Sequence, residues 1–249
     1  MRPTVMAGLL VLVAASRVQA QSLARQVDRV RDGKVRMSFA TRPEVCGNGR
    51  NISIVRSTDD WESDCQHGPA RVVLEQRAGK LARVDTYVGG RWRETTDDVT
   101  DLGTVGAAEA AAYLLDLAAR VPGSLGDKLV FPATLADSAT VWPTLVKLAR
   151  DAGVPRETRK GAVFWLGQAA GAEVTRALGG LLEDTTDREI QKQAVFALSQ
   201  HKGDDAVPML IRIAREHKDP EVRKSAMFWL GQTGDPRAVS FFEEILTGH

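Results

Sequence analysis

The sequence carries almost no net charge. Its 33 lysine and arginine residues stand against 32 aspartate and glutamate residues, which gives a formal net charge of +1 at pH 7. A chain without an excess of positive charge lacks the electrostatic signature of a general binder of nucleic acids or anionic membranes. Hydrophobic residues at 43% and charged residues at 26% are ordinary fractions for a folded soluble protein. We therefore expect a folded protein with no nucleic acid among its partners.

Motifs for catalysis are also missing. The chain has four histidines, and none belongs to a His-Glu-x-x-His, Gly-x-Ser-x-Gly or phosphate-loop pattern. His201 and His217 lie near expected helix ends, where a solvated or capping role is usual. His67 and the two cysteines show no ligand spacing that indicates a metal site. We predict no catalytic residues, no metal site and no cofactor, and the sequence favours a protein that is not an enzyme.

Only one segment has the character of a membrane element, and it lies at the N-terminus. An apolar stretch from Val5 to Ala15 follows Arg2 and precedes a small-residue site of the Ala-x-Ala type at residues 18–20. The stretch is too short to span a bilayer as a mature helix. These features predict a cleaved signal peptide at residues 1–20, with an uncleaved anchor as the alternative. We expect an exported protein, periplasmic or extracellular, with no stable membrane insertion after cleavage.

The chain has two cysteines, Cys46 and Cys65. An even number of cysteines in an exported chain indicates a disulfide. The enclosed loop is rich in Gly, Asn, Asp and Ser. A crosslink stabilises such a loop by limiting its unfolded states, by about 3 kcal/mol for a loop of this size. We predict a Cys46–Cys65 disulfide, and two unpaired thiols are the alternative.

Residues 21–103 have the pattern of a small α+β module. Apolar residues at helical spacing predict a short helix over residues 22–31, and alternation over residues 34–39 predicts a strand. Two further runs within residues 70–88 flank a turn at residues 78–80 and predict a hairpin. Together these elements indicate a meandering antiparallel sheet.

From residue 104 to the C-terminus the chain reads as helical, and part of it repeats with a step of 32 residues. The three clear copies lie at residues 158–168, 190–200 and 222–232. The positions they share are Lys160/Lys192/Lys224, Ala162/Ala194/Ala226, Phe164/Phe196/Phe228, Leu166/Leu198/Leu230 and Gln168/Gln200/Gln232. A fainter copy runs over residues 129–150. We predict that residues 104–249 form about four helix pairs, preceded by a helix at residues 107–119.

The repeated segments resemble the HEAT-like family, including the short repeats of phycobilisome-lyase-type proteins. The resemblance is carried by Val-Arg-x-x-Ala-x-x-x-Leu-Gly at residues 222–231 and by Gly-Asp-Pro-Arg-Ala-Val at residues 234–239. It covers about half of the chain. It implies an α-helical solenoid, a curved stack of helix pairs, placed after the small α+β module. Solenoids of this kind offer extended surfaces that bind other proteins.

The resemblance also selects candidate contact residues. In a HEAT-like stack the second helix of each pair usually lines the concave face, which favours the cations Lys147, Arg176 and Arg212 as partner-binding residues. Trp165 and Trp229 lie on first helices. They are either exposed aromatic anchors for a partner or side chains that pack between repeats, and packing is the favoured interpretation.

A ladder of lysines follows the first helices: Lys160, Lys192 and Lys224, with Arg159 and Arg223 beside it. It is either a groove for an acidic segment or a solvated edge whose lysines pair with the acids Glu157, Glu189 and Glu221. The solvated edge is favoured, because exposed ion pairs are common and contribute little to stability.

These observations favour an exported, non-enzymatic scaffold or regulator that binds another protein. The alternative is a carrier of a small ligand or pigment, or a lyase-like enzyme, with a cleft between the module and the solenoid. The module itself either presents a binding surface, through residues 89–92 and the loop between the cysteines, or caps the first repeat.

Overall fold

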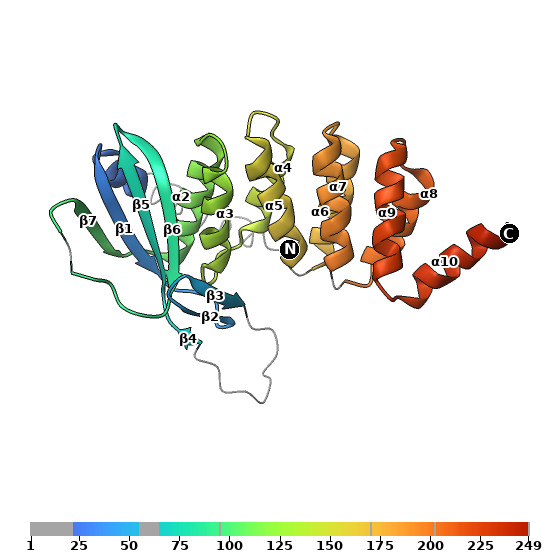
Figure 1. The fold of residues 1–249 in the computed structure, drawn as a ribbon, viewed down its shortest axis with the longest axis horizontal. Helices are drawn as coiled ribbons and strands as arrows, with labels where there is room; N and C mark the ends of the chain where they lie inside the picture. The colour runs from blue at the N-terminus through green and yellow to red at the C-terminus, as the bar shows by residue number, and fades with distance from the viewer. Residues whose placement is uncertain (1–21, 55–64, 95, 170, 202, 249) are drawn as a thin grey trace, which may run out of the picture. The chain divides into compact units, whose positions relative to one another are not determined.

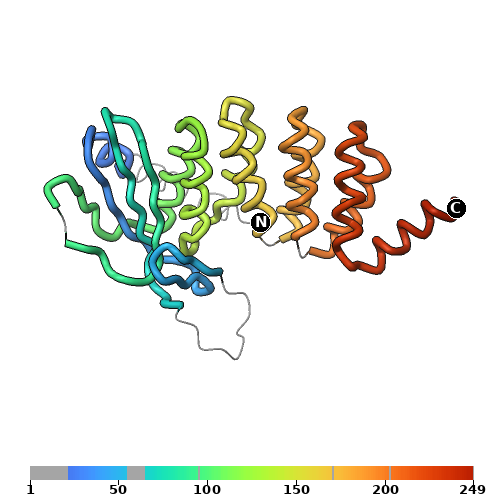
Figure 2. Tube along the Cα trace, in the orientation of Figure 1, coloured from blue at the N-terminus to red at the C-terminus, as the bar shows by residue number. Residues whose placement is uncertain are grey.

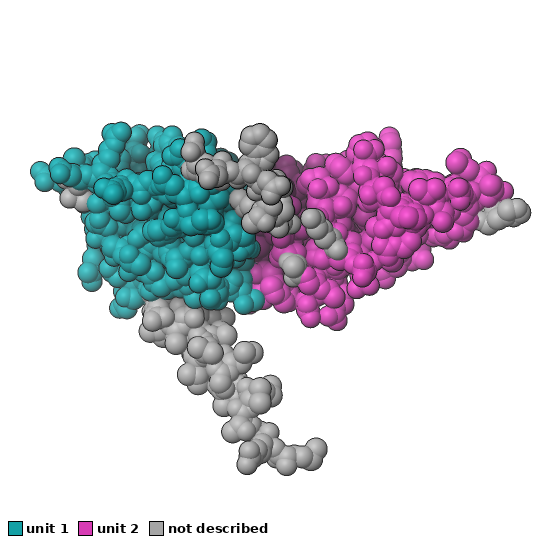
Figure 3. All heavy atoms as spheres, turned by 90° about the horizontal axis from the view of Figure 1, so that it is seen from below, with its two compact units in different colours: residues 1–141 teal, residues 142–249 magenta. Residues whose placement is uncertain are grey.

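The computed structural model describes residues 22–54, 65–94, 96–169, 171–201 and 203–248. The chain divides into two compact units, Met1–Val141 and Trp142–His249, which Figure 3 colours separately. The signal peptide expected at residues 1–20 lies outside the described residues. In the described part of the chain, no helix is both long enough and apolar enough to cross a membrane.

The first unit is built on two small sheets. The four-stranded sheet has the order β6-β5-β1-β7. Its strands are β1 (Gly33–Phe39), β5 (Ala70–Arg77), β6 (Lys80–Val88) and β7 (Val99–Thr104). The three-stranded sheet has the order β3-β2-β4, from strands β2 (Val45–Asn48), β3 (Asn51–Ile54) and β4 (Gln66–His67). The predicted α+β character of this part of the chain is confirmed.

Strand alternation gives the larger sheet one apolar and one charged face. Val35, Met37 and Phe39 of β1 are fully buried, as are the apolar residues of β5 on the same face. On this side α3 (Leu125–Leu135) packs against β5 and β6, and α2 (Ala107–Arg120) packs against α3 (Figure 1). Because successive side chains in a strand point to opposite faces, the opposite face carries the charged residues. That face holds the pocket described below.

The predicted hairpin is confirmed, and the predicted meander is wrong in one respect. β5 and β6 pair as antiparallel neighbours across the turn at Ala78 and Gly79. β7, however, pairs with β1 in parallel, so a segment over residues 89–98 connects the two outer strands of the sheet. The sequence of β7, Val-Thr-Asp-Leu-Gly-Thr, is polar and mostly exposed at a sheet edge, and it lacks the alternation that marks a half-buried strand.

The second unit is a stack of helices (Figures 1 and 2). They are α4 (Trp142–Arg150), α5 (Arg156–Gln168), α6 (Ala172–Asp184), α7 (Arg188–Gln200), α8 (Ala206–Glu216), α9 (Pro220–Gln232) and α10 (Pro236–Thr247). The first helices of the three clear repeats, α5, α7 and α9, pack against one another in sequence. The predicted helical repeat is therefore confirmed.

Small and apolar residues at a fixed position drive this stacking. Ala162, Ala194 and Ala226 are each completely buried, and the leucine four residues later in each helix is buried with them. A small side chain at this position lets neighbouring helices approach closely, and positions four apart lie on the same helix face. The repeated Ala and Leu of the sequence are thus buried at equivalent positions of the first helices, which pack against one another.

The faint early copy spans the two units. Its first helix, α3, packs against α2 and the sheet of the first unit, and its second helix, α4, packs against α5 and α6 of the second. The sequence changes character where β7 ends at Thr104 and α2 begins at Ala107. The division by compactness falls between Val141 and Trp142, and the domain boundary drawn at residue 104 stays a prediction.

Candidate functional site

Of the three cations predicted to contact a partner, Arg212 lies in a groove. It projects from α8, and its guanidinium lies 3.5 Å from the carboxylate of Glu183 on α6. The groove between these second helices has a volume of about 320 Å³. Its lining is Gly179, Leu182, Glu183, Arg212, Ile213, Glu216, His217 and Lys218, which we call the second-helix groove. It combines charged side chains with an apolar floor.

The other two predicted cations lie outside this groove. Arg176 is exposed near the start of α6 and pairs with Glu173 of the same helix at 3.7 Å. Lys147 is exposed on α4, and it has no ion-pair partner among the described residues. The three positions therefore lie along successive second helices, as predicted, and each has a different electrostatic setting.

Ion pairs also connect the second helices to one another. Arg150 on α4 pairs with Asp184 on α6 at 2.8 Å, and Arg215 on α8 pairs with Glu244 on α10 at 2.5 Å. Together with the Arg212–Glu183 pair, they link each second helix to the next. Exposed pairs of this kind contribute little each, so their main effect is to set where charge lies on this surface.

Of the two tryptophans, Trp229 contacts a ring of the neighbouring repeat, and Trp165 contacts a ring of its own helix. Trp229 is half-buried on α9, and its ring centroid lies 4.7 Å from that of Phe196 on α7. Trp165 is half-buried on α5, with its ring edge-on to Phe164 at 5.1 Å. Each ring thus makes a packing contact and keeps part of its surface exposed. The role of the two tryptophans as partner anchors remains a prediction.

Two of the three ladder lysines form ion pairs with the expected acids. Lys160 pairs with Glu157 at 3.5 Å, and Lys192 pairs with Glu189 at 3.9 Å. Arg159 is not part of this exposed edge. It is 6% exposed and donates to the Ala149 carbonyl and to Asp187. The solvated-edge interpretation is therefore supported for Lys160 and Lys192, while Lys224 is exposed and its expected pair with Glu221 stays a prediction.

Exposed apolar side chains gather on the last two helices. The large hydrophobic residues that are exposed in the described chain are Met227, Phe228, Val239, Ile245 and Leu246. All of them belong to α9 or α10.

A second cavity, of about 530 Å³, lies on the charged face of the larger sheet in the first unit. The sequence reasoning noted residues 89–92 as a possible surface and missed the rest of this site. Its charged lining comprises seven cations, Lys34, Arg36, Arg50, Arg71, Arg83, Arg91 and Arg93, and three acids, Glu75, Asp85 and Glu94. Its uncharged lining includes Val73, Tyr87, Trp92 and Val99. We call this site the sheet pocket.

Aromatic rings and guanidinium groups interleave in the sheet pocket. The centroid of the Trp92 ring lies 5.0 Å from the guanidinium carbon of Arg36 and 5.9 Å from that of Arg71. Tyr87 lies edge-on to Trp92, with centroids 6.4 Å apart, and Arg50 lies over the Tyr87 ring at 5.4 Å. Contacts of this type hold a guanidinium in place without neutralising its charge.

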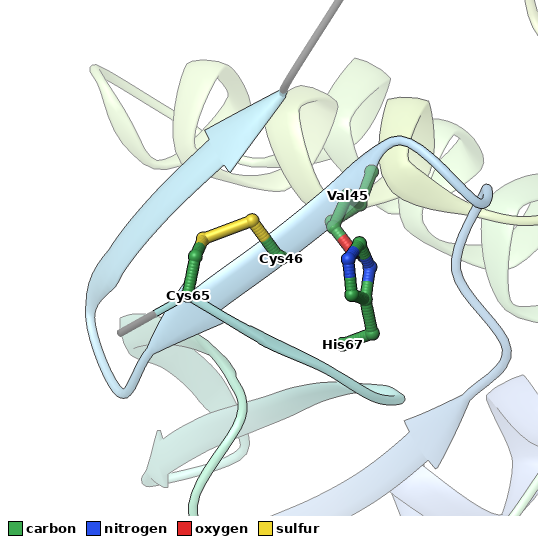
Figure 4. The surroundings of a disulfide bond; sticks show 4 residues. All are labelled: Val45, Cys46, Cys65 and His67. Atoms are coloured by element: carbon green, nitrogen blue, oxygen red, sulfur yellow. Dashed lines mark hydrogen bonds between the residues drawn. A yellow bond between two sulfur atoms is a disulfide. The ribbon is translucent and has the colours of Figure 1, made fainter. Parts of the chain in front are cut away.

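The smaller sheet carries the predicted disulfide. Cys46 on β2 and Cys65 are joined by an S–S bond of 2.04 Å (Figure 4). The ring of His67 on β4 lies beside it, with Nδ1 3.0 Å from the Val45 carbonyl oxygen. Among the described residues, no group of three or more His, Cys, Asp or Glu side chains is placed to hold a metal ion.

His201 and His217 occupy repeat joints of the solenoid. The Nδ1 of His201 accepts a hydrogen bond from the backbone N–H of Gly203 at 3.0 Å. The Nδ1 of His217 accepts one from the N–H of Asp219 at 3.1 Å. Both rings therefore cap the chain where one helix ends and the next is about to begin, which is a structural role.

Comparison with known proteins agrees with the stack. No curated protein matches the chain at a significant level. The family model of HEAT repeats matches residues 177–248, which run from within α6 to the end of the described chain. Residues 177–248, in the C-terminal half of the protein, are thus similar to HEAT repeats, in agreement with the helical stack.

Proposed function

We propose that the protein is an exported, non-enzymatic scaffold that binds another protein along the second helices of its HEAT repeats. HEAT repeats are in general protein-interaction scaffolds, because stacking leaves one layer of helices as an extended surface. The observation that supports the proposal most directly is the second-helix groove, with Arg212 at its edge and Leu182 and Ile213 in its lining. A mixed polar and apolar groove suits a protein partner.

The charges of this surface define the kind of contact. Arg212 and Lys218 line the groove together with Glu183 and Glu216, so the groove is neutral overall and patterned in sign. Such a pattern selects a partner by complementarity and orientation more than by net attraction. We expect the exposed Lys147 and Arg176 to extend the contact along α4 and α6.

The test is capture of the partner with charge-reversed protein. The bait is the full mature chain, applied to the native cell-envelope and secreted fractions, with bound proteins identified by mass spectrometry. The variant combines Lys147→Glu, Arg176→Glu and Arg212→Glu. We expect a stoichiometric protein partner on the wild type and its loss from the variant, because reversed charges oppose the partner's own pattern.

The matched control reverses three cations of the other helix layer: Lys160→Glu, Lys192→Glu and Lys224→Glu. It changes the net charge by the same amount, and it leaves the second helices untouched. Equal loss of the partner from both variants would show a nonspecific charge effect and contradict the proposed surface. A small molecule that co-purifies in stoichiometric amount, in place of a protein, would contradict the scaffold proposal itself.

A further inference from the structure

The sheet pocket concentrates positive charge on a protein whose net charge is close to zero. Its lining has an excess of four cationic side chains, against a formal net charge of +1 for the whole chain. Asymmetry of this size in one cavity attracts anions, because the walls of a cavity focus the field of its charges. The sheet pocket lies in the first unit and is separate from the HEAT-repeat surface of the proposed function.

Several of these cations already pair with acids of the chain. Arg36 donates to Asp101 at 2.7 and 2.8 Å. Asp85 accepts from both Arg83, at 2.7 Å, and Arg50, at 3.0 Å. Lys34 pairs with Asp98 at 3.6 Å. Asp98 and Asp101 lie outside the lining, and counting them with the three acids of the lining leaves an excess of two cations. The lining thus keeps several guanidinium groups in place and leaves the arginines in excess over carboxylates.

Three arginines have no carboxylate partner among the described residues. Arg71 donates to the Gly89 carbonyl at 2.7 Å and lies beside the Trp92 ring, so its side chain is fixed while its charge is not neutralised. Arg91 and Arg93 are exposed on either side of the half-buried Trp92. A fixed guanidinium loses little freedom when it binds a carboxylate, which makes Arg71 a preorganised anion site.

The spacing of these arginines indicates the form of the anion. Arg91 and Arg93 are exposed, two residues apart, on either side of Trp92, whose ring contacts Arg36, Arg71 and Tyr87. Alternate side chains of an extended peptide are about 7 Å apart, so acidic residues at alternate positions can each meet a separate arginine. Separate charges spread along the pocket suit several spaced carboxylates better than one compact phosphate.

The uncharged lining of the sheet pocket is apolar and aromatic. Val73, Val99, Tyr87 and Trp92 supply apolar and aromatic surface between the charges. The volume of about 530 Å³ is in the range of pockets that enclose small ligands or a few side chains. We propose that the sheet pocket binds an acidic peptide segment of another protein, with alternate Asp or Glu residues on Arg71, Arg91 and Arg93 and an apolar side chain against Trp92 and Tyr87.

The experiment measures binding of a defined probe to the full mature chain. The probe is a fluorescein-labelled peptide, Gly-Glu-Ala-Glu-Phe-Glu-Ala-Glu-Gly, followed by fluorescence anisotropy at low and at physiological ionic strength. We expect saturable binding that weakens as salt rises, because exposed charges are screened. The Arg91→Glu/Arg93→Glu variant should weaken binding at least tenfold. Both side chains are exposed, so its circular dichroism spectrum and melting curve should match those of the wild type.

A matched control variant reverses two exposed cations elsewhere in the same unit, Arg29→Glu and Lys128→Glu. It should bind the peptide within twofold of wild type. The Arg212→Glu variant should also bind the peptide as the wild type does. A failure of the sheet-pocket proposal can therefore be distinguished from a failure of the HEAT-repeat proposal. The inference is overturned if the peptide does not bind, if Arg91→Glu/Arg93→Glu binds it unchanged, or if an oligothymidylate of equal charge binds more tightly than the peptide.

Discussion

Gly167 on α5 lies directly against Ala197 on α7. A Cβ placed on Gly167 would stand 2.8 Å from the Cβ of Ala197 and 2.9 Å from its Cα and carbonyl oxygen. This contact explains a break in the repeat, where Ala197 occupies the position held by Trp165 and Trp229 in the other two copies. Ala197 is 2% exposed, and the close approach of α5 leaves no room there for an indole.

Gly167→Ala should therefore destabilise the protein, although alanine is the better helix former. The added methyl meets backbone atoms of α7, which cannot move without shifting the helix, and overpacking of this kind costs about 1–3 kcal/mol. Gly231→Ala at the same position of α9 is the control, because nothing lies within 4 Å of its added Cβ. It should stabilise by up to about 1 kcal/mol. Urea unfolding measures both, and stabilisation by both would contradict the packing described.

Asp187 supports a joint between repeats in two ways. As the N-cap of α7, it accepts the N–H of Glu189 at 3.1 Å. It also pairs with Arg156 and Arg159 of α5, each at 3.0 Å. Burial disfavours its charge, but the hydrogen bonds from Arg156 and from backbone N–H groups hold the pKa of Asp187 below its ordinary value.

Asp187→Ala should lower the free energy of unfolding by roughly 2–4 kcal/mol, because it removes a cap and leaves the buried Arg159 without its carboxylate. Asp235→Ala is the comparison. Asp235 caps α10 in the same way, but its arginine partner, Arg237, is an exposed neighbour on the same helix. The loss should be smaller at Asp235. An equal loss at both positions, measured by urea unfolding, would mean that the contacts to α5 contribute nothing.

The solenoid was predictable from the sequence because its contacts repeat. Ala162, Ala194 and Ala226 recur every 32 residues, and all three are buried. The repeat in the sequence therefore corresponds to equivalent positions in the structure. β7 was not predictable in this way. It is polar, and it is held by parallel pairing with β1, a partner more than 60 residues away in the chain. Local alternation carries no information about such a pairing.

The two candidate sites also differ in how far the sequence could predict them. Arg212 could be selected as a contact residue from the sequence, because its position in the repeated helix indicates that it is exposed and which layer of the stack it belongs to. The sheet pocket could not be selected, because its arginines come from β1, β5, β6, the turn between β2 and β3 and the segment after β6. Only the pairing of strands places them together. In the sequence, Arg36 and Arg71 are ordinary solvent-side residues of two separate strands. Their shared contact with Trp92 depends on the path of the chain between β6 and β7.

His201 gives the solenoid a dependence on pH. Burial lowers the pKa of His201 below its ordinary value of 6.5, and the Ala169 carbonyl opposes this shift. When the pH falls below 6.5, His201 is therefore protonated in the unfolded chain while it is still neutral in the folded chain. The unfolded state is then favoured, so the contribution of His201 to stability is complete above 6.5 and declines as the pH falls toward the lower folded value.

We accordingly expect the free energy of unfolding to decline as the pH falls below about 6.5, and His201→Asn to reduce this decline. Asparagine can still accept the Gly203 N–H, so the joint keeps its hydrogen bond and loses only the titration. Urea unfolding across this pH range in both proteins gives the comparison. The same decline in both would assign the pH dependence to other groups.

The Cys46–Cys65 disulfide closes a loop with a sequence separation of 19 residues. In the chain-entropy model, a crosslink of this length stabilises the folded state by about 3 kcal/mol, because it restricts the unfolded chain. The Cys46→Ser/Cys65→Ser variant should lose that amount. The effect should fall on the first unit, where β2 pairs with β4 next to Cys46. Hydrogen exchange of the β2–β4 amides should therefore accelerate, while the amides of α7 and α9 exchange as in the wild type. Faster exchange throughout the solenoid instead would show that the crosslink acts on the whole chain, and unchanged exchange in the small sheet would show that its strands do not depend on the bond.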